Sequence, residues 1–404
     1  MKKSLVALAA LAVVGVASAQ SSVTLFGIVD TGLNYSTNKN AAGVTAKRTS
    51  MVSGANMTSR FGMRGTEDLG GGLAASFWLE AGLFTDEGVA GASPVVAGST
   101  STSGTSQLFN RRSTVSLSGN FGEVRLGRDL VATYLNDSAA DPFGQVGVGK
   151  SLIYAASNAF TVQQVDTTGA ADTGGNYVRS SNAISYILPS NLGGFYGQLM
   201  YGLDEKDQIS NQTNSSTGRY IGGRAGYASG PVNVAASYGE STLDGLSTPV
   251  VINGILLGGK NKESIANIFG TYDFGVAKLW AEYGRTSADR ARGYGALGTT
   301  TDGVSGWNLA VTAPVGPGTI KASYGRVKYS LADVAPAGTA TPKVNQWSLG
   351  YQYDLSKRTA LYATASRISN SNGANLTVGG PAFVNDGSNA KTSTGYDFGL
   401  RHSF

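Results

Sequence analysis

Apolar and polar side chains alternate along many segments of this chain, and this two-residue period constrains the fold more than any other feature of the sequence. In the last ten residues, 395–404, one face carries aromatic and aliphatic side chains and the other carries glycine and polar ones. The same period recurs at 23–35, 232–238, 278–283 and 346–354. Successive side chains of a β-strand point to opposite faces, so each segment predicts a strand that separates an apolar medium from a polar one. The apolar face of the last segment consists of Tyr396, Phe398, Leu400, His402 and Phe404.

The N-terminal segment has the features of a secretory signal peptide. After two lysines, an apolar run of 13 residues (5–17) leads into an Ala-Ser-Ala sequence that ends at Ala19. A basic start, a short apolar stretch and a small-residue site are typical of a signal that is removed. We therefore expect 1–19 to be a signal peptide and 20–404 to be the mature protein. A retained N-terminal anchor is the alternative.

The mature part contains no apolar run of roughly 20 residues that could cross a membrane as a helix. No alternating segment is apolar on both faces, whereas a large soluble β-protein needs some fully buried strands. The chain has no cysteine, so disulfides cannot hold it together. Closed barrels are the other structure that satisfies every backbone polar group in lipid. The sequence thus predicts an all-β fold: a transmembrane antiparallel β-barrel.

The lengths of the connections predict the number of strands. Seven short turns alternate with eight long polar loops, of which the first falls at 36–46 and the third at 130–176. This pattern predicts 16 strands, with short periplasmic turns and long extracellular loops, around an aqueous lumen.

Little in the sequence supports catalysis, a metal or a cofactor. The single histidine, His402, lies on the apolar face of the last strand, and no thiol is present. The glycines at 70–72 lack the Gly-Lys-Ser/Thr ending of a phosphate loop. The net charge of +5 is spread along the chain without the basic cluster that nucleic acid requires. We expect neither an enzyme nor a nucleic-acid-binding protein, and no cofactor.

Several arginines fall on the lumen side of the early strands. A charge on the lipid side would cost roughly 2–4 kcal/mol at the bilayer midplane, so these side chains should point into water. Rings of charge set ion preference in pores. Alternatively, the arginines only pair with nearby acids such as Glu123 and Asp129. The arginines in question are Arg60, Arg64, Arg112, Arg125 and Arg128.

The loop at 130–176 is long enough to have a function of its own. Folded into the barrel, it would narrow the lumen and set its acids, Asp137 and Asp141 among them, against the arginines. The field between the two walls would then orient dipolar solutes. An outward surface loop is the alternative.

Four segments give the chain a resemblance to general porins of the beta-proteobacterial type, over essentially its whole mature length. They are 22–30 (SVTLFGIVD), 59–69 (SRFGMRGTEDL), 122–129 (GEVRLGRD) and 395–404 (GYDFGLRHSF). The resemblance implies a barrel of 16 strands in the outer membrane, usually a homotrimer. It also implies that the C-terminal residues from Tyr396 to Phe404 are a signal read by the barrel-assembly machinery. In that family the third loop folds into the pore and often carries a Pro-Glu-Phe-Gly-like motif, whereas 141–144 here reads Asp-Pro-Phe-Gly.

The function expected from these features is passive diffusion of ions and small hydrophilic solutes, with a mild preference for anions. A channel selective for organic anions would use the same arginines. A secreted, adhesin-like β-protein is the alternative from another class.

Overall fold

The computed structural model describes residues 22–91, 108–162, 177–205, 207, 216, 218–243, 250–252, 255–257, 261–294, 299–331, 338–379 and 390–404. The proposed signal peptide lies outside these residues.

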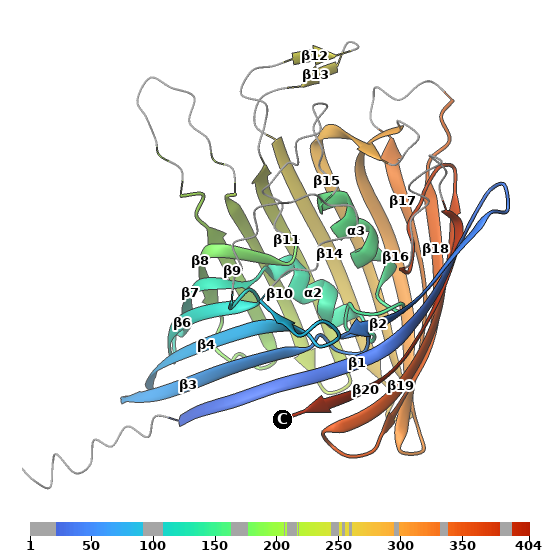
Figure 1. Ribbon diagram of the computed structural model, residues 1–404. Coiled ribbons are helices and arrows are strands. Elements are labelled where there is room, and N and C mark those ends of the chain that lie inside the picture. The colour runs from blue at the N-terminus through green and yellow to red at the C-terminus, as the bar shows by residue number, and fades with distance from the viewer. Residues whose placement is uncertain are drawn as a thin grey trace, which may run out of the picture.

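A single antiparallel sheet wraps round on itself and closes where the last strand meets the first (Figure 1). Its N-terminal strands are β1 (Ser22–Asn40), β2 (Thr45–Ser53), β3 (Arg60–Gly70), β4 (Leu73–Phe84), β5 (Val89–Ala90), β6 (Arg112–Gly119), β7 (Gly122–Leu130), β8 (Arg179–Ile187) and β9 (Phe195–Gly202). The sheet continues with β10 (Tyr220–Ser229), β11 (Val232–Leu243), β14 (Asn261–Asp273), β15 (Lys278–Tyr294), β16 (Thr299–Val315), β17 (Gly318–Leu331), β18 (Lys343–Asp354), β19 (Thr359–Ser371) and β20 (Ala390–Ser403). A separate hairpin pairs β12 (Val250–Ile252) with β13 (Ile255–Leu257).

The barrel has 16 strands, which confirms the prediction. β2 and β3 are two halves of one barrel strand, because β2 pairs with the upper part of β1 and β3 pairs with its lower part. The break between them, at 54–59, folds over Asp30 of β1, whose carboxylate accepts hydrogen bonds from the backbone amides of Asn56 and Met57. β5 is a two-residue strand at the edge of β4, which is its one partner among the described strands.

Short turns close one end of the barrel, and the longer connections lie at the other (Figure 1). One predicted loop is mostly strand: β1 runs to Asn40 and β2 begins at Thr45, so the first hairpin turns within 41–44 instead of 36–46. The sequence predicts a loop at the polar residues Thr37, Asn38 and Lys39, but they pair regularly with β2 above the apolar part of the strand.

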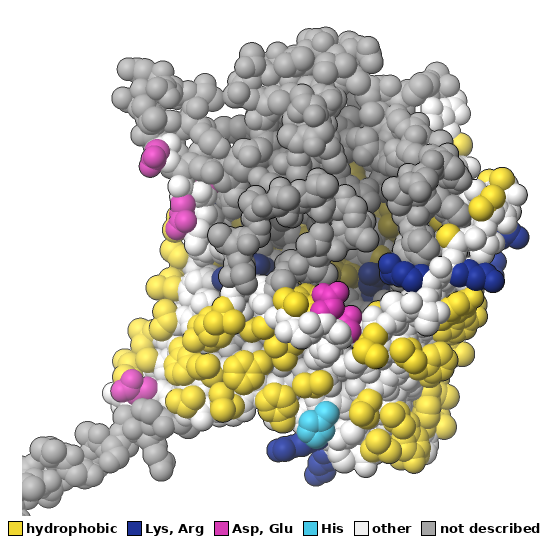
Figure 2. Space-filling view, viewed as in Figure 1, with side chains coloured by type: hydrophobic (Ala, Val, Ile, Leu, Met, Phe, Trp, Pro, Cys, Tyr) yellow, Lys and Arg dark blue, Asp and Glu magenta, His cyan; other side chains and the backbone are white. Residues whose placement is uncertain are grey.

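The alternation places apolar side chains outside and polar ones inside. On β18, Trp347 and Leu349 are exposed on the outer face, while Gln346 and Ser348 are buried toward the lumen. Figure 2 shows the result on one face of the molecule, where hydrophobic side chains cover the lower barrel wall. In a bilayer this hydrophobic surface contacts lipid, and polar groups face the lumen.

Two helices of the third loop lie inside the barrel: α2 (Ala132–Ala140) and α3 (Leu152–Val162). α2 contacts β9, β10, β11, β14 and β15, and α3 contacts β15, β16 and β17, so the loop leans on one side of the wall. The predicted inward fold of this loop is therefore confirmed. Neither helix is long and apolar enough to span a membrane.

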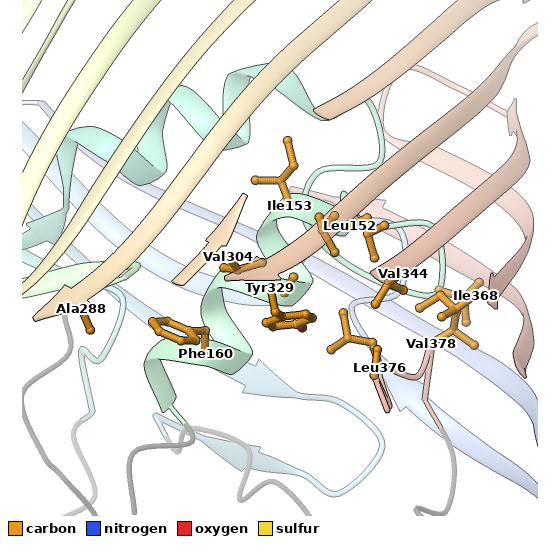
Figure 3. Close-up of a cluster of buried hydrophobic side chains, with 14 residues drawn as sticks. Leu152, Ile153, Phe160, Ala288, Val304, Tyr329, Val344, Ile368, Leu376 and Val378 are labelled. Carbon is orange, nitrogen blue, oxygen red and sulfur yellow. The ribbon is translucent and has the colours of Figure 1, made fainter. Parts of the chain in front are cut away.

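An apolar cluster attaches α3 to the wall, and this differs from the polar lumen that we expected. Leu152 and Phe160 of α3 form one cluster with Val304 of β16 and Val344 of β18, which face the lumen (Figure 3). Val327 of β17 belongs to the same cluster. These valines occupy positions on the otherwise polar side of their strands because the helix covers them. The segment before β20 adds Leu376 and Val378 to the same cluster.

Candidate functional site: the pore constriction

Strand register places four of the arginines on the lumen face of neighbouring strands. Arg64 on β3 lies opposite Trp78 on β4, and Arg112 on β6 lies opposite Glu80 on β4. Arg125 on β7 lies opposite Ser116 on β6. Arg60 is four residues before Arg64 on β3, so it lies on the same face of the strand. These side chains therefore line one wall of the pore. We call this surface the arginine wall; with Arg111, Arg128 and Arg179, described below, it has seven members.

Carboxylates within the arginine wall hold several guanidinium groups in place. Glu80 pairs with Arg60 at 3.7 Å and also with Arg111. Asp129 pairs with Arg112 at 3.5 Å and with Arg125 at 2.7 Å. A second carboxylate, Glu123, bonds Arg125 at 2.9 Å. Pairing with nearby acids, which the sequence left open as an alternative, thus occurs for part of the set.

Arg64 has an aromatic neighbour on each side. Its guanidinium lies 5.6 Å from the ring centroid of Phe26 and 5.0 Å from that of Trp78. Arg112 lies 4.5 Å from the ring centroid of Trp78. Contact with ring faces fixes an arginine while its charge remains available to solutes. Among the described residues Arg64 has no carboxylate partner within 4 Å.

Arg128 sits beside a β-bulge and joins two arginines that the sequence interpretation missed. Its guanidinium donates to the carbonyl of Asn110 (2.7 Å) and to the hydroxyl of Ser181 (2.8 Å). Arg179 of β8 donates to the carbonyl of Arg111 at 2.7 Å. Arg111 precedes its strand and Arg179 begins another, so alternation offered no signal for either. The seven arginines face three carboxylates, Glu80, Glu123 and Asp129, which leaves the arginine wall with four net positive charges.

Asp141 organises the third loop from within. Its carboxylate accepts hydrogen bonds from the backbone amides of Phe143 (2.9 Å), Gln145 (3.0 Å) and Ser151 (2.9 Å). The side chain is buried, so it does not reach solutes in the lumen. Asp141 therefore shapes the turn between α2 and α3, and it does not face the arginine wall.

Asp137 on α2 points toward the opposite wall. The Tyr177 hydroxyl donates to its carboxylate at 2.7 Å, and Glu282 of β15 is a close carboxyl neighbour. Burial raises the pKa of Asp137 to about 6. The prediction that Asp137 and Asp141 face the arginines was therefore wrong. Both carboxyl groups are buried where the third loop contacts the side of the barrel opposite the arginine wall.

The shifted pKa predicts that acid tightens the docking of α2. A carboxyl group whose pKa is raised by burial stabilises the docked loop below its ordinary pKa of about 4, and this contribution is lost as the pH rises through about 6. We expect hydrogen exchange of the α2 amides, corrected for intrinsic rates, to be slower near pH 4 than near neutrality. Asp137→Asn should reduce this difference, and Asp137→Asn combined with Glu282→Gln should remove it, because Glu282 is the second buried carboxyl group at this contact. The same pH dependence in the double variant would contradict the assignment.

Asp397 of β20 ties the loop to the barrel. One of its oxygens accepts from the side-chain amide of Asn34 and the other accepts from the backbone amide of Val148, both at 2.7 Å. The neighbouring Gly147 has a φ of 63° and lies against the backbone of Ala55, so this close approach requires a glycine.

Loss of this tie should loosen the constriction. Asp397→Ala leaves the Val148 amide and the Asn34 side chain without their acceptor, at a cost of about 1–3 kcal/mol each. We expect more open-channel current noise and faster proteolysis within the third loop, with the barrel intact. Thr394→Ala, on the outer face of the same strand, is the control; equal noise in the two variants would count against the tie.

At the C-terminus, Phe404 completes the closure of the barrel. Its backbone amide donates to the carbonyl of Gly27 at 3.0 Å, and the Gly27 amide donates back at 3.1 Å. Its ring rests against Gly27, where any larger residue would collide with it. Of the other predicted signal residues, Tyr396 stacks on Tyr35 and His402 shares a hydrogen bond with Thr359. The signal residues up to His402 lie on the outer face of β20, and Phe398, Leu400 and Phe404 are about half exposed.

Known proteins share this architecture and sequence. The chain is 40% identical to outer membrane porin protein 32 of Delftia acidovorans, with both chains fully covered. It is 31% identical to an outer membrane porin protein of Bordetella pertussis, again over both full lengths. Among solved structures, the anion-selective porin from Comamonas acidovorans superposes with a TM-score of 0.70 at 35% identity, covering 95% of this chain and all of the other. The family model described as Gram-negative porin matches residues 5–373. The chain therefore belongs to the Gram-negative porin family and is located in the outer membrane.

Proposed function

We propose that the protein forms a water-filled channel for passive diffusion of ions and small hydrophilic solutes, with a mild preference for anions. The observation that carries this proposal is the net positive charge of the arginine wall. The third loop occupies the side of the lumen formed by β9 to β17, so solutes pass on the side where the arginines lie. A cavity of about 280 Å³ beside Arg64, Arg112 and Arg125 lies along this route. The 35% identical Comamonas protein is described as anion-selective, which supports the same preference here.

Conductance of the purified protein in a planar bilayer tests the channel itself. A diffusion pore should give steps that increase in proportion to the salt concentration and show the same conductance at either polarity. Absence of discrete conductance steps would contradict the proposal.

The second candidate, a channel selective for organic anions, also relies on the arginine wall. Trp78 lies between two guanidinium groups there and could contact a planar carboxylate. Addition of benzoate at constant ionic strength separates the two functions. A diffusion pore shows no saturation, whereas a selective channel shows saturable block of the chloride current. The third candidate, a secreted adhesin, has no support once the family is known.

Three further features are proposed on the basis of the family resemblance. Residues 1–19 are removed on export, three copies assemble in the membrane, and the barrel-assembly machinery recognises the C-terminal strand. N-terminal sequencing of the purified protein should begin at Gln20. Native mass spectrometry should show three chains, and a stable monomer would contradict the assembly.

A further inference from the structure

Basic side chains gather on the outer face of the barrel, at the level of its upper aromatic residues and just above them. Arg326 and Lys328 of β17 share the outward parity of the exposed Tyr324, and Arg367 of β19 is also exposed. Arg285 of β15 and Lys343 of β18 belong to the same face. We call these five residues the outer basic patch.

The register brings the outer basic patch together across five strands. Arg285 lies opposite Ser305, Ser305 lies opposite Lys328, and Lys328 lies opposite Lys343. Two residues further down the strands, Arg326 lies between Trp307 and Asn345. The next row places Arg367 opposite Trp347. No Asp or Glu occupies these rows, and no ion pair involving the patch occurs in the described part of the chain.

The height of the outer basic patch corresponds to lipid headgroups. Trp307, Tyr324 and Trp347 are exposed on the outer face and form the upper aromatic girdle, with Trp307 and Tyr324 rings 5.6 Å apart. Aromatic girdles mark the boundary between hydrocarbon and headgroups. Lys343 is four residues above Trp347, about 13 Å along the strand at 3.3 Å per residue. Arg285, Lys328 and Lys343 therefore lie in the polar layer of the extracellular leaflet, where lipid phosphates lie. Arg326 and Arg367 lie at the level of the girdle, and their long side chains can extend up to that layer.

The other rims of the barrel differ. On β11 and β14 the outward Lys262 forms an ion pair with Glu240 at 2.6 Å, which neutralises that region. Beyond the outer basic patch, further outward basic residues are Lys39 of β1 and Lys47 of β2. Figure 2 shows Lys and Arg side chains above the hydrophobic surface on that side. These cations have no carboxylate partner among the residues that the structure describes. Their concentration on one part of the lipid-facing surface has no role in conduction, since the side chains are outside the pore.

We infer that the outer basic patch binds the phosphate headgroup of a lipid in the extracellular leaflet, whose acyl chains lie along the hydrophobic surface below. Arginine is suited to phosphate because its planar fork makes two parallel hydrogen bonds. The acyl chains would contact Leu309 and Leu349, the exposed residues beneath Trp307 and Trp347. This inference concerns the lipid-facing wall and does not depend on ion selectivity.

Tryptophan fluorescence offers a local measurement of this binding. The chain has four tryptophans, of which Trp307 and Trp347 are on the outer face beside the patch, whereas Trp78 and Trp280 face the lumen. The protein is reconstituted with phosphatidic acid or phosphatidylcholine that carries brominated acyl chains, which quench nearby tryptophans. We expect phosphatidic acid to bind about tenfold better than phosphatidylcholine, because each basic side chain near the headgroups adds attraction.

Two variants make the test specific. Arg326→Gln with Lys328→Gln should reduce the preference to about twofold or less. Lys262→Gln, in the region where Glu240 neutralises the lysine, should leave the preference for phosphatidic acid unchanged. If the double variant does not assemble, Lys328→Gln alone replaces it in the test. Inorganic phosphate at constant ionic strength should not compete, because binding also requires the acyl chains. Equal quenching by the two lipids, an unchanged preference in the variants, or displacement by inorganic phosphate would each overturn the inference.

Discussion

We expect a channel carrying Arg64→Glu together with Arg128→Glu to lose its preference for anions. Neither arginine has a carboxylate partner within 4 Å in the described structure, so both contribute fully to the net charge of the arginine wall. Two charge reversals change that net charge from four positive charges to none. The permeability ratio of chloride to potassium, obtained from the zero-current potential in a salt gradient, should fall several-fold to near one.

A matched pair of substitutions separates a local effect from a change in overall charge. Arg326→Glu with Arg367→Glu alters the total charge equally but lies on the lipid side of the barrel. We expect this control to keep the original permeability ratio. If the two double variants behave alike, the arginine wall does not set selectivity.

Deletion of Phe404 should have the second large effect, on assembly. The deletion removes both main-chain hydrogen bonds to Gly27, each worth about 0.5–1.5 kcal/mol, at the seam where β20 meets β1. It also removes a ring exposed on the outer face, where assembly machinery could contact it. We expect most of the protein to be absent from the heat-resistant outer-membrane fraction on electrophoresis.

Phe404→Ser distinguishes the two contributions. This variant keeps the backbone hydrogen bonds and loses only the ring. A defect as severe as that of the deletion assigns the role to the ring, and normal assembly of both variants would contradict a role for the C-terminal residue.

The barrel itself could be predicted from the sequence because each strand of the barrel wall has an apolar outer side and a polar side toward the lumen. That environment imposes a period of two on the side chains, so the parity of Arg64, Arg112 and Arg125 also fixed which way they point. The strand number followed from the alternation of short and long connections.

Features that depend on the third loop could not be predicted in the same way. Asp137 and Asp141 are buried by contacts between segments far apart in the sequence, such as α2 with β15, and no local period reports those contacts. Val304 and Val327 break the polar lumen pattern for the same reason, since α3 covers them.

The direction of the Arg128 side chain could not be predicted by alternation, because this residue lies beside a β-bulge. The register of β7 against β8 shifts between Gly127 and Asp129, and Gly127 has a φ of 117°, which glycine tolerates best. Beyond that point, counting residues no longer gives the direction of a side chain. Arg111 and Arg179 were not predicted to face the lumen. They lie at the ends of strands, where alternation does not indicate the direction of a side chain.

Substituted-cysteine labelling on β6 tests the central claim most directly, since the chain has no cysteine of its own. Ser116 lies on the lumen face beside Arg125, and its neighbour Leu117 is exposed on the outer face. Ser116→Cys in the membrane-embedded protein should react with a water-soluble anionic thiosulfonate, and faster than with the cationic analogue, while Leu117→Cys should react with neither. Labelling of Leu117→Cys in place of Ser116→Cys, or a faster reaction with the cation, would contradict a wet, basic lumen enclosed by an apolar wall.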